Sequence, residues 1–194
     1  MAASSKYGFH YRRHLIPNCE SPAMLEVIIS DSAGNLTIGD KVQWTGGYLM
    51  GSAPDAAFLG FLAGFVTSKG ENIFKTKDSI TGTKTGDDTY NASATNTTVD
   101  QVKGVVIVDP QALFFGYCDD TLTQAMVGNY FYTVATDGTY ADSADLTGQG
   151  AYVAGTQDVQ LVELVTTLDD GSTSTKAGLW RIARSQIAIN DPTA

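Results

Sequence analysis

Hydrophobic residues in this chain come in short runs that end at turn-forming residues. The densest region, residues 102–138, contains three such runs: Val105–Val108, Leu113–Cys118 and Tyr130–Ala135. Each run is followed by a pair that favours a turn, namely Asp109-Pro110, Asp119-Asp120 and Asp137-Gly138. Short apolar runs that stop at Asp, Pro or Gly are typical of buried strands. We therefore predict three core strands here, and nothing in this region suggests catalytic chemistry.

Strand patterns continue on both sides of this region. They predict strands at 24–30, 36–38, 41–44, 48–50, 152–154, 159–166 and 179–188. Gly46-Gly47 predicts a tight turn, whereas the polar segment 141–150 predicts a connection. No segment has the periodicity of an amphipathic helix of three turns. Roughly eight to ten strands at turn-rich spacing predict an all-β fold, either a β-barrel or a sandwich.

The segment Phe58–Thr67 is apolar throughout and contains Gly60 and Gly64. On a helix the two glycines would form a face of small residues. On a strand they would mark bulges or a close approach of backbone. The short length, flanking turns and aromatic content favour the strand.

Two segments lack core residues. Residues 1–22 form a polar and aromatic arm, broken by Pro17 and Pro22, and residues 69–100 are rich in threonine. The expected organisation is an extended N-terminal arm followed by one β-rich domain at 23–194. The Thr-rich segment is expected to supply no core and to form a long loop, an extended hairpin or an excursion onto a neighbour.

The arm is rich in residue types that interfaces favour, so we predict that it docks on a partner or a neighbouring subunit instead of hanging free. The candidate interface residues are Tyr7, Phe9, His10, Tyr11, Arg12, Arg13 and His14.

A short internal similarity links Ile38–Val42, IGDKV, with Val127–Phe131, VGNYF. Five positions are a weak pattern, but they are compatible with two related β units.

Composition and charge narrow the classes of partner. The net charge is −9, and only 17% of residues are charged. No Lys or Arg lies between Lys103 and Lys176, while the arm carries Lys6, Arg12 and Arg13. Binding to nucleic acid needs clustered basic residues, so we do not expect it. The asymmetry suggests that the two ends meet different partners, although the acids could simply solvate loops. No signal peptide or membrane span is predicted, so we expect the protein to stay where it is made.

The search for catalytic or metal chemistry finds little. His10 and His14 are four residues apart, but a third ligand and a helix to hold them are missing. The paired acids lack calcium-loop spacing, and no nucleophile motif is present. We expect no metal site, no cofactor and no enzymatic activity.

Four further side-chain positions follow from the strand pattern. Trp44 and Trp180 are predicted to fill the core, and Glu26 and Glu163 to face solvent. Cys19 and Cys118 have no close spacing, so two free buried thiols are favoured over a disulfide.

Several motifs resemble the decoration, or capsid cement, proteins of tailed-bacteriophage heads. The similarity covers most of the chain but departs from the family pattern in the Thr-rich stretch, which is longer here. The residues that carry it are Arg13-His14-Leu15, Gly39-Asp40-Lys41-Val42, Phe58–Phe65, Val108-Asp109-Pro110, Phe114, Phe115, Leu122, Val127-Gly128-Asn129, Val159–Leu168 and Leu179–Asn190.

The resemblance implies a β-rich structural virion protein that binds the outer surface of the capsid and bridges neighbouring major capsid subunits, commonly as a homotrimer. It implies synthesis in the host cytoplasm, no cofactor, and no direct contact with nucleic acid or membrane. The alternative is a receptor- or carbohydrate-binding β domain of a phage tail or fibre. In that case the aromatic residues Trp44, Tyr48, Tyr90 and Trp180 would stack on sugar rings.

Overall fold

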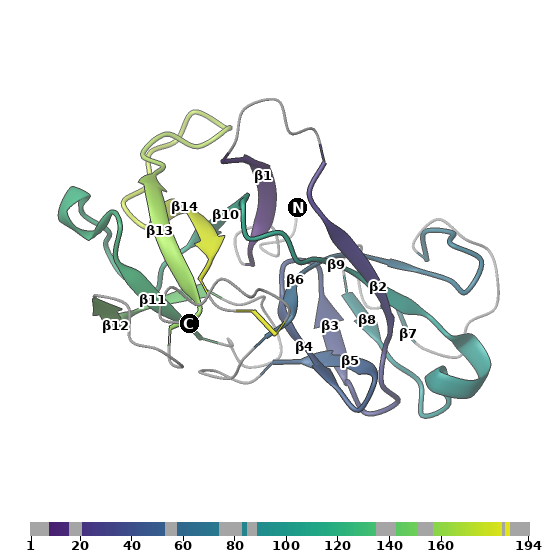
Figure 1. Ribbon diagram of the computed structural model, residues 1–194. Coiled ribbons are helices and arrows are strands. Elements are labelled where there is room, and N and C mark those ends of the chain that lie inside the picture. The colour runs from purple at the N-terminus through teal and green to yellow at the C-terminus, as the bar shows by residue number, and fades with distance from the viewer. Residues whose placement is uncertain are drawn as a thin grey trace.

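The computed structural model describes residues 8–15, 21–52, 58–73, 83–84, 89–134, 143–150, 157–183 and 185–186. Antiparallel strands form two lobes that lie side by side (Figure 1). The strands are β1 (His10–His14), β2 (Met24–Ile28), β3 (Asn35–Thr37), β4 (Lys41–Thr45), β5 (Tyr48–Gly51), β6 (Gly60–Val66), β7 (Thr83–Lys84), β8 (Thr89–Asn91), β9 (Lys103–Ile107), β10 (Ala112–Tyr117), β11 (Tyr130–Val134), β12 (Ser143–Gly150), β13 (Val159–Leu164) and β14 (Ala177–Ile182). A π-helical turn at Asn96–Asp100 and a 3-10 turn at Gln124–Met126 complete the described elements.

Three open sheets carry these strands. One has the order β1-β10-β14-β13-β11-β12, a second β2-β9-β6-β4-β5, and a small third sheet β3-β8-β7. The predicted all-β fold is confirmed. Of the two predicted forms, the described strands make the sandwich, and none of their sheets closes into a barrel.

The two large sheets repeat one topology. The first unit uses β2, β4, β5, β6 and β9, and the second uses β10, β11, β12, β13 and β14. When the strands are numbered one to five within each unit, both sheets have the order 1-5-4-2-3. A shared order of five strands, all in sequence, indicates that the chain contains the same β unit twice.

Hydrogen bonds at the start of the second strand of each unit match one another. The amide of Gly39 donates to the Leu62 carbonyl at 2.7 Å, and the amide of Gly128 donates to the Leu161 carbonyl at 2.8 Å. Gly39 and Gly128 have φ values of +99° and +94°, which side-chain-bearing residues rarely adopt. The similarity between residues 38–42 and 127–131 therefore marks equivalent turns in two related units.

Each unit also rolls up in the same way. In the first, Ile29 after β2 forms a parallel bridge with Leu49 of β5. In the second, Cys118 after β10 forms a parallel bridge with Ala144 of β12. The first strand thus meets the third across the curled sheet. The buried apolar residues form two clusters, one within the first unit and one centred on the second unit that also takes in Phe58, Phe61 and Ile107 of the first.

The segment Phe58–Thr67 forms strand β6, as predicted, and its two glycines have the two roles expected on a strand. A Cβ at Gly60 would collide with the carbonyl oxygen of Ile107 on β9, so only glycine lets the strands pair this closely. The β6–β9 register shifts between Leu62 and Gly64, which is a β-bulge.

Two predictions for polar segments are wrong. Residues 143–150 form strand β12 instead of a connection, because pairing with β11 satisfies their backbone. The Thr-rich segment does supply core, since Tyr90 and Asn96 are fully buried in the first unit. Its β7–β8 pairing matches the extended hairpin among the predicted forms. The predicted turn 137–138 and strand 152–154 lie outside the described residues.

Asn96 shows how a polar segment can close a core. Its side-chain amide donates to the carbonyls of Ile29 at 2.7 Å and Val102 at 3.1 Å, and its Oδ1 accepts from the Tyr90 hydroxyl at 3.2 Å. A buried amide with these partners costs little, because its hydrogen-bonding capacity is used.

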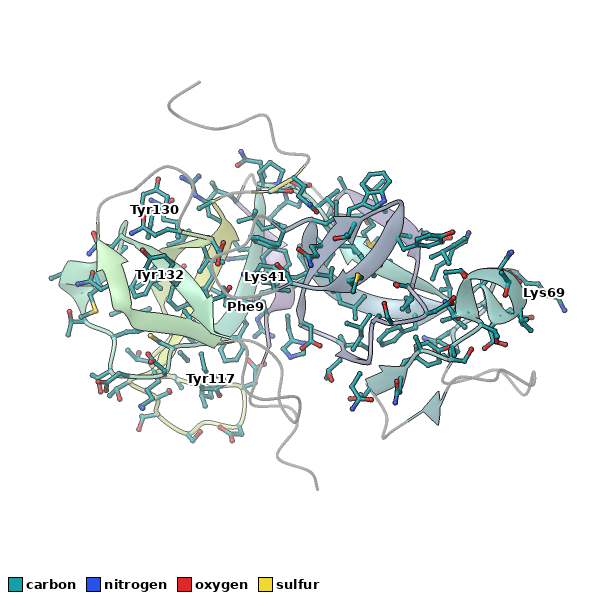
Figure 2. All side chains as sticks on the ribbon, turned by 90° about the horizontal axis from the view of Figure 1, so that it is seen from below. Phe9, Lys41, Lys69, Tyr117, Tyr130 and Tyr132 are labelled. Carbon is teal, nitrogen blue, oxygen red and sulfur yellow. The ribbon has the colours of Figure 1, made fainter. Side chains whose placement is uncertain are left out.

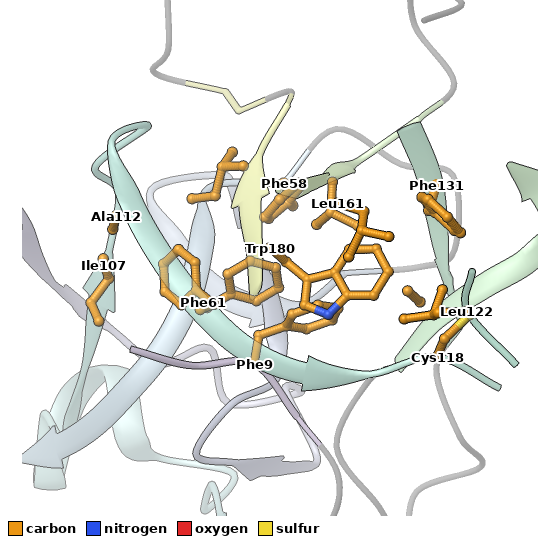
Figure 3. Packing of buried hydrophobic residues seen from close by; sticks show 14 residues of the cluster. Phe9, Phe58, Phe61, Ile107, Ala112, Cys118, Leu122, Phe131, Leu161 and Trp180 are labelled. Atoms are coloured by element: carbon orange, nitrogen blue, oxygen red, sulfur yellow. The ribbon is translucent and has the colours of Figure 1, made fainter. Parts of the chain in front are cut away.

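Of the two tryptophans predicted to fill the core, one is buried and the other is exposed. Trp180 is fully buried at the centre of the second core, where its ring lies 5.0 Å from that of Phe131 (Figure 3). Trp44 is 45% exposed near the end of β4, so its prediction is wrong. Cys118 is buried with a free thiol, as predicted, and Cys19 lies outside the described residues.

A buried ion pair connects the two units. Lys41 Nζ of β4 lies 3.0 Å from Asp158 Oδ2, just before β13, and both side chains are at most 1% exposed. Asp158 Oδ2 also accepts from the Thr133 hydroxyl at 2.9 Å. Figure 2 shows Lys41 and Phe9 in the region where the two lobes meet.

Candidate functional site

The arm is part of the fold over residues 8–15. Strand β1 pairs antiparallel with β10 at the edge of the six-stranded sheet. Ahead of it, Phe9 is 1% exposed and belongs to the core of the second unit. Its ring stacks on Phe61 of the first unit at 4.4 Å and meets Trp180 edge-on at 6.2 Å (Figure 3). Phe9 therefore joins the units, and its side chain is not available to a partner in this structure.

The arm residues divide between two faces of the sheet. His10 lies opposite Phe115 and His14 opposite Ala112, which are three residues apart on β10 and so face opposite sides. His10 and His14 thus do not converge on one ion, and the described residues contain no cluster of three potential metal ligands. Tyr11 packs against the core. Tyr7 lies outside the described residues.

His14 fixes the arm from the inner side. Its Nε2 lies 2.9 Å from Asp109 Oδ2, with the His14 side chain 5% exposed, although the contact does not have the geometry of a hydrogen bond. Asp109 also accepts from the amides of Ala23 at 3.1 Å and Gln111 at 2.8 Å. The Asp-Pro turn between β9 and β10 therefore holds the arm and the start of β2 together.

Four of the seven predicted interface residues line one groove of about 780 Å³. They are His10, Tyr11, Arg12 and Arg13. The remaining lining residues come from β10, β13, β14 and the loop after β13: Phe115, Glu163, Val165, Thr167, Leu168, Asp169 and Leu179.

The groove has an apolar floor between charged walls. Phe115, Val165 and Leu179 provide the floor. Arg12 forms a two-bond pair with Asp169, at 2.5 and 3.0 Å, and Arg13 Nη2 lies 2.6 Å from Glu163 Oε2. All four charged side chains are more than half exposed, so each pair contributes at most about 1 kcal/mol to stability.

Exposed ion pairs of this strength can exchange partners with little loss of free energy. A ligand in the groove would therefore find apolar area to bury and four charged groups that can turn toward it. An apolar centre with a charged, wet rim is the usual form of a protein interface.

One end of this face carries an aromatic pair. The rings of Phe115 and Tyr117 meet edge-on at 5.3 Å. Burial, with a smaller contribution from the nearby Asp170 carboxylate, raises the pKa of Tyr117, so its hydroxyl stays neutral in ordinary conditions.

Sequence reasoning found the arm but missed the opposite wall. Glu163 was predicted to face solvent, and its side chain is 53% exposed, but its place beside Arg13 had no local signal. The two residues are 150 positions apart, so only the sheet order β1-β10-β14-β13 brings them together.

A scan against protein-family models and searches of curated proteins and solved structures found no match to this chain. Within the described part of the chain, no helix has the length and apolar character needed to cross a membrane.

Proposed function

We propose that this protein is a decoration, or cement, protein of a tailed-bacteriophage head. It binds the outer surface of the capsid, bridges neighbouring major capsid subunits and assembles as a homotrimer. The motifs described above, from Arg13-His14-Leu15 to the C-terminal strands, support this assignment through their resemblance to that family.

The observation that carries the proposal is the groove built by the arm. His10, Arg12 and Arg13 stand on one side of an apolar floor, and Glu163 and Asp169 stand on the other. A framework of two packed β units gives this surface a rigid support. A protein that binds only the assembled shell stabilises that shell by its binding free energy, multiplied over many sites.

Co-sedimentation with purified heads of the phage tests the proposal. The wild-type protein is expected to bind saturably, at a fixed ratio to capsid subunits. The variant Arg12→Ala/Arg13→Ala, with one wall removed, is expected to bind at least about tenfold more weakly, which corresponds to about 1.4 kcal/mol. Absence of saturable binding by the wild-type protein would overturn the proposed function.

A matched control exists in the first unit. Lys69 and Glu71 are exposed charged residues near the turn that is equivalent to the 168–172 turn beside the groove. The variant Lys69→Ala/Glu71→Ala is expected to bind heads as the wild-type protein does. Equal losses in both variants would show that general surface charge, not the groove, determines binding.

The carbohydrate-binding alternative has weaker support. Of the four aromatic residues predicted to stack on sugars, Tyr90 and Trp180 are buried, while Trp44 and Tyr48 are exposed. In the β4–β5 hairpin Trp44 lies opposite Leu49 and Tyr48 opposite Thr45, so the two exposed rings are on opposite faces. They do not form one stacking platform. Specific binding on a glycan array would favour this alternative.

A further inference from the structure

Comparison of the two units shows a strand edge that is covered in the second unit and open in the first. Strand β10 is the first strand of the second unit, and β1 covers its outer edge. Strand β2 is the first strand of the first unit, and among the described strands only β5 reaches the equivalent edge, at the Ile29–Leu49 bridge just beyond the end of β2. Figure 1 shows β2 beside β9 in the right-hand lobe.

The hydrogen-bond pattern shows which backbone groups this edge presents. The Val108 amide donates to the Ala23 carbonyl, and the Ile29 amide donates to the Val102 carbonyl. Because directions alternate along a strand, residues 23, 25, 27 and 29 direct their N–H and C=O groups at β9. Met24, Glu26 and Ile28 therefore direct theirs outward. Those of Met24 and Glu26 are where an added strand would find them, whereas Ile28 adjoins the bridge from Ile29 to Leu49 of β5.

The second unit shows how such an edge is used. There β1 pairs antiparallel with Leu113 and Phe115, through Arg13 and His10. Equivalent cross-strand glycines, Gly104 opposite Val27 and Gly178 opposite Gly116, align the two units residue by residue. In this alignment Met24 takes the place of Leu113, and Glu26 takes the place of Phe115.

Side chains distinguish the two edges and so define the occupant. Gly116 leaves room for Phe9, because a Cβ at Gly116 would lie 2.8 Å from the Phe9 ring. Val27 stands at the equivalent position, so a segment with a large residue there, such as the arm of a second copy, does not fit. Glu26 is half exposed and pairs with Lys103 of β9 at 3.2 Å, and a partly exposed pair of this kind can exchange its cation for a basic residue of an added strand opposite Glu26. Two β2 strands paired about Glu26 would place like charges together.

We propose that the free edge of β2 is a docking site for an extended segment of a partner protein. The segment adds antiparallel to Met24–Ile28, with a basic residue opposite Glu26 and a small residue opposite Val27. Main-chain hydrogen bonds supply affinity in such strand addition, and the alternate side chains supply specificity. This site is separate from the groove and does not depend on the proposed function.

Amide chemical shifts of the full-length protein test the site. The probe is a blocked peptide with the sequence of residues 8–15 that carries Phe9→Ser and His10→Arg, which makes the two changes that the β2 edge requires. The control peptide carries Phe9→Ser and His10→Glu. Shifts are expected at Met24–Ile28, with at least about tenfold weaker binding of the control peptide.

Two protein variants test separately the contribution of charge and the contribution of backbone hydrogen bonds to peptide binding. Glu26→Lys is expected to reverse the preference between the two peptides. Met24→Pro removes one outward N–H at the first residue of the strand, where proline is tolerated, and is expected to weaken both peptides about tenfold.

Three outcomes would overturn the proposal. One is the absence of shifts at Met24–Ile28 at millimolar peptide. Another is shifts at Ala112–Tyr117 alone, because the peptide would then have displaced β1. The third is a concentration-dependent shift at Met24–Ile28 without peptide, together with a doubled mass by light scattering, because a second copy would then occupy the edge.

Discussion

The two β units share a framework and differ in what is added to it. Each has five strands in the order 1-5-4-2-3 and a β-bulge in its fourth strand. The first unit carries the Thr-rich segment with β7, β8 and the buried Asn96. The second carries β1 and the groove. The repeated strands supply rigidity, and the surfaces suited to binding come from segments that only one unit has.

The place of the largest addition is well defined. After the fourth strand, the Thr67 amide donates to Glu71 at 2.8 Å, and in the second unit the Leu168 amide donates to Ser172 at 2.8 Å. Gly70 has a φ of +82°, and Gly171 has a φ of +80°. Both units therefore make the same turn, and the chain of the first unit then continues into the added segment before it returns to β9.

The largest effect is expected from the buried ion pair between the units. Lys41→Met leaves Asp158 buried without its cation, and removing one partner of such a pair typically costs about 3–5 kcal/mol. The double variant Lys41→Met/Asp158→Leu is expected to regain most of this loss. Urea unfolding measures both. If Lys41→Met and the double variant lose equal stability, the pair is not what connects the units.

A comparable substitution at an exposed pair provides the control. Arg13→Met leaves Glu163 in solvent, and a change below about 1 kcal/mol is expected. A larger loss would mean that the groove wall contributes to folding as well as to surface chemistry.

Phe9→Ala is expected to destabilise the protein slightly less than Lys41→Met does, by about 3 kcal/mol. The large-to-small change opens a cavity among aromatic rings of both units. Deletion of residues 1–15 should therefore destabilise the fold, and not merely remove a binding tail. Thermal unfolding checks both variants. An unchanged melting temperature after the deletion would show that β1 contributes no stability.

These positions show what the sequence could predict. Local signals were sufficient for most core strands and for the strand at Phe58–Thr67, because apolar runs and turn residues act over a few positions. They were insufficient for β12, whose polar residues become a strand only through pairing with β11. The arm was found by its composition, but the burial of Phe9 depends on the missing side chain of Gly116, which lies more than 100 residues away.

Equivalent glycines allow a direct comparison of the units. Gly39→Ala and Gly128→Ala both place a side chain at a positive φ, which costs about 1 kcal/mol. A Cβ at Gly39 would also lie 3.0 Å from the Gly8 Cα, whereas a Cβ at Gly128 meets nothing within 4 Å. Gly39→Ala is therefore expected to cost about 2 kcal/mol and Gly128→Ala about 1 kcal/mol by urea unfolding. An equal loss of stability in the two variants would mean that the backbone at Gly8 moves to make room for the added methyl group.

Stability is also expected to change at high pH, where buried tyrosine and cysteine side chains of both units titrate. Burial raises the pKa of Tyr90 in the added segment from 10.0 to about 12, and it raises the pKa of Cys118 after β10 from 9.0 to about 12. Between these values the folded state keeps a proton that the unfolded state releases, so stability falls as pH rises from 9 to 12. Melting temperatures from pH 8 to pH 11.5 measure this fall. Cys118→Ala should flatten this fall from pH 9 and Tyr90→Phe only from pH 10, because these are the pKa values at which the two groups begin to lose their protons in the unfolded chain. Tyr90→Phe leaves Asn96 Oδ1 with a donor, since it still accepts from the Val102 amide. If both variants followed the wild-type curve, neither group would be protected from ionisation by the fold.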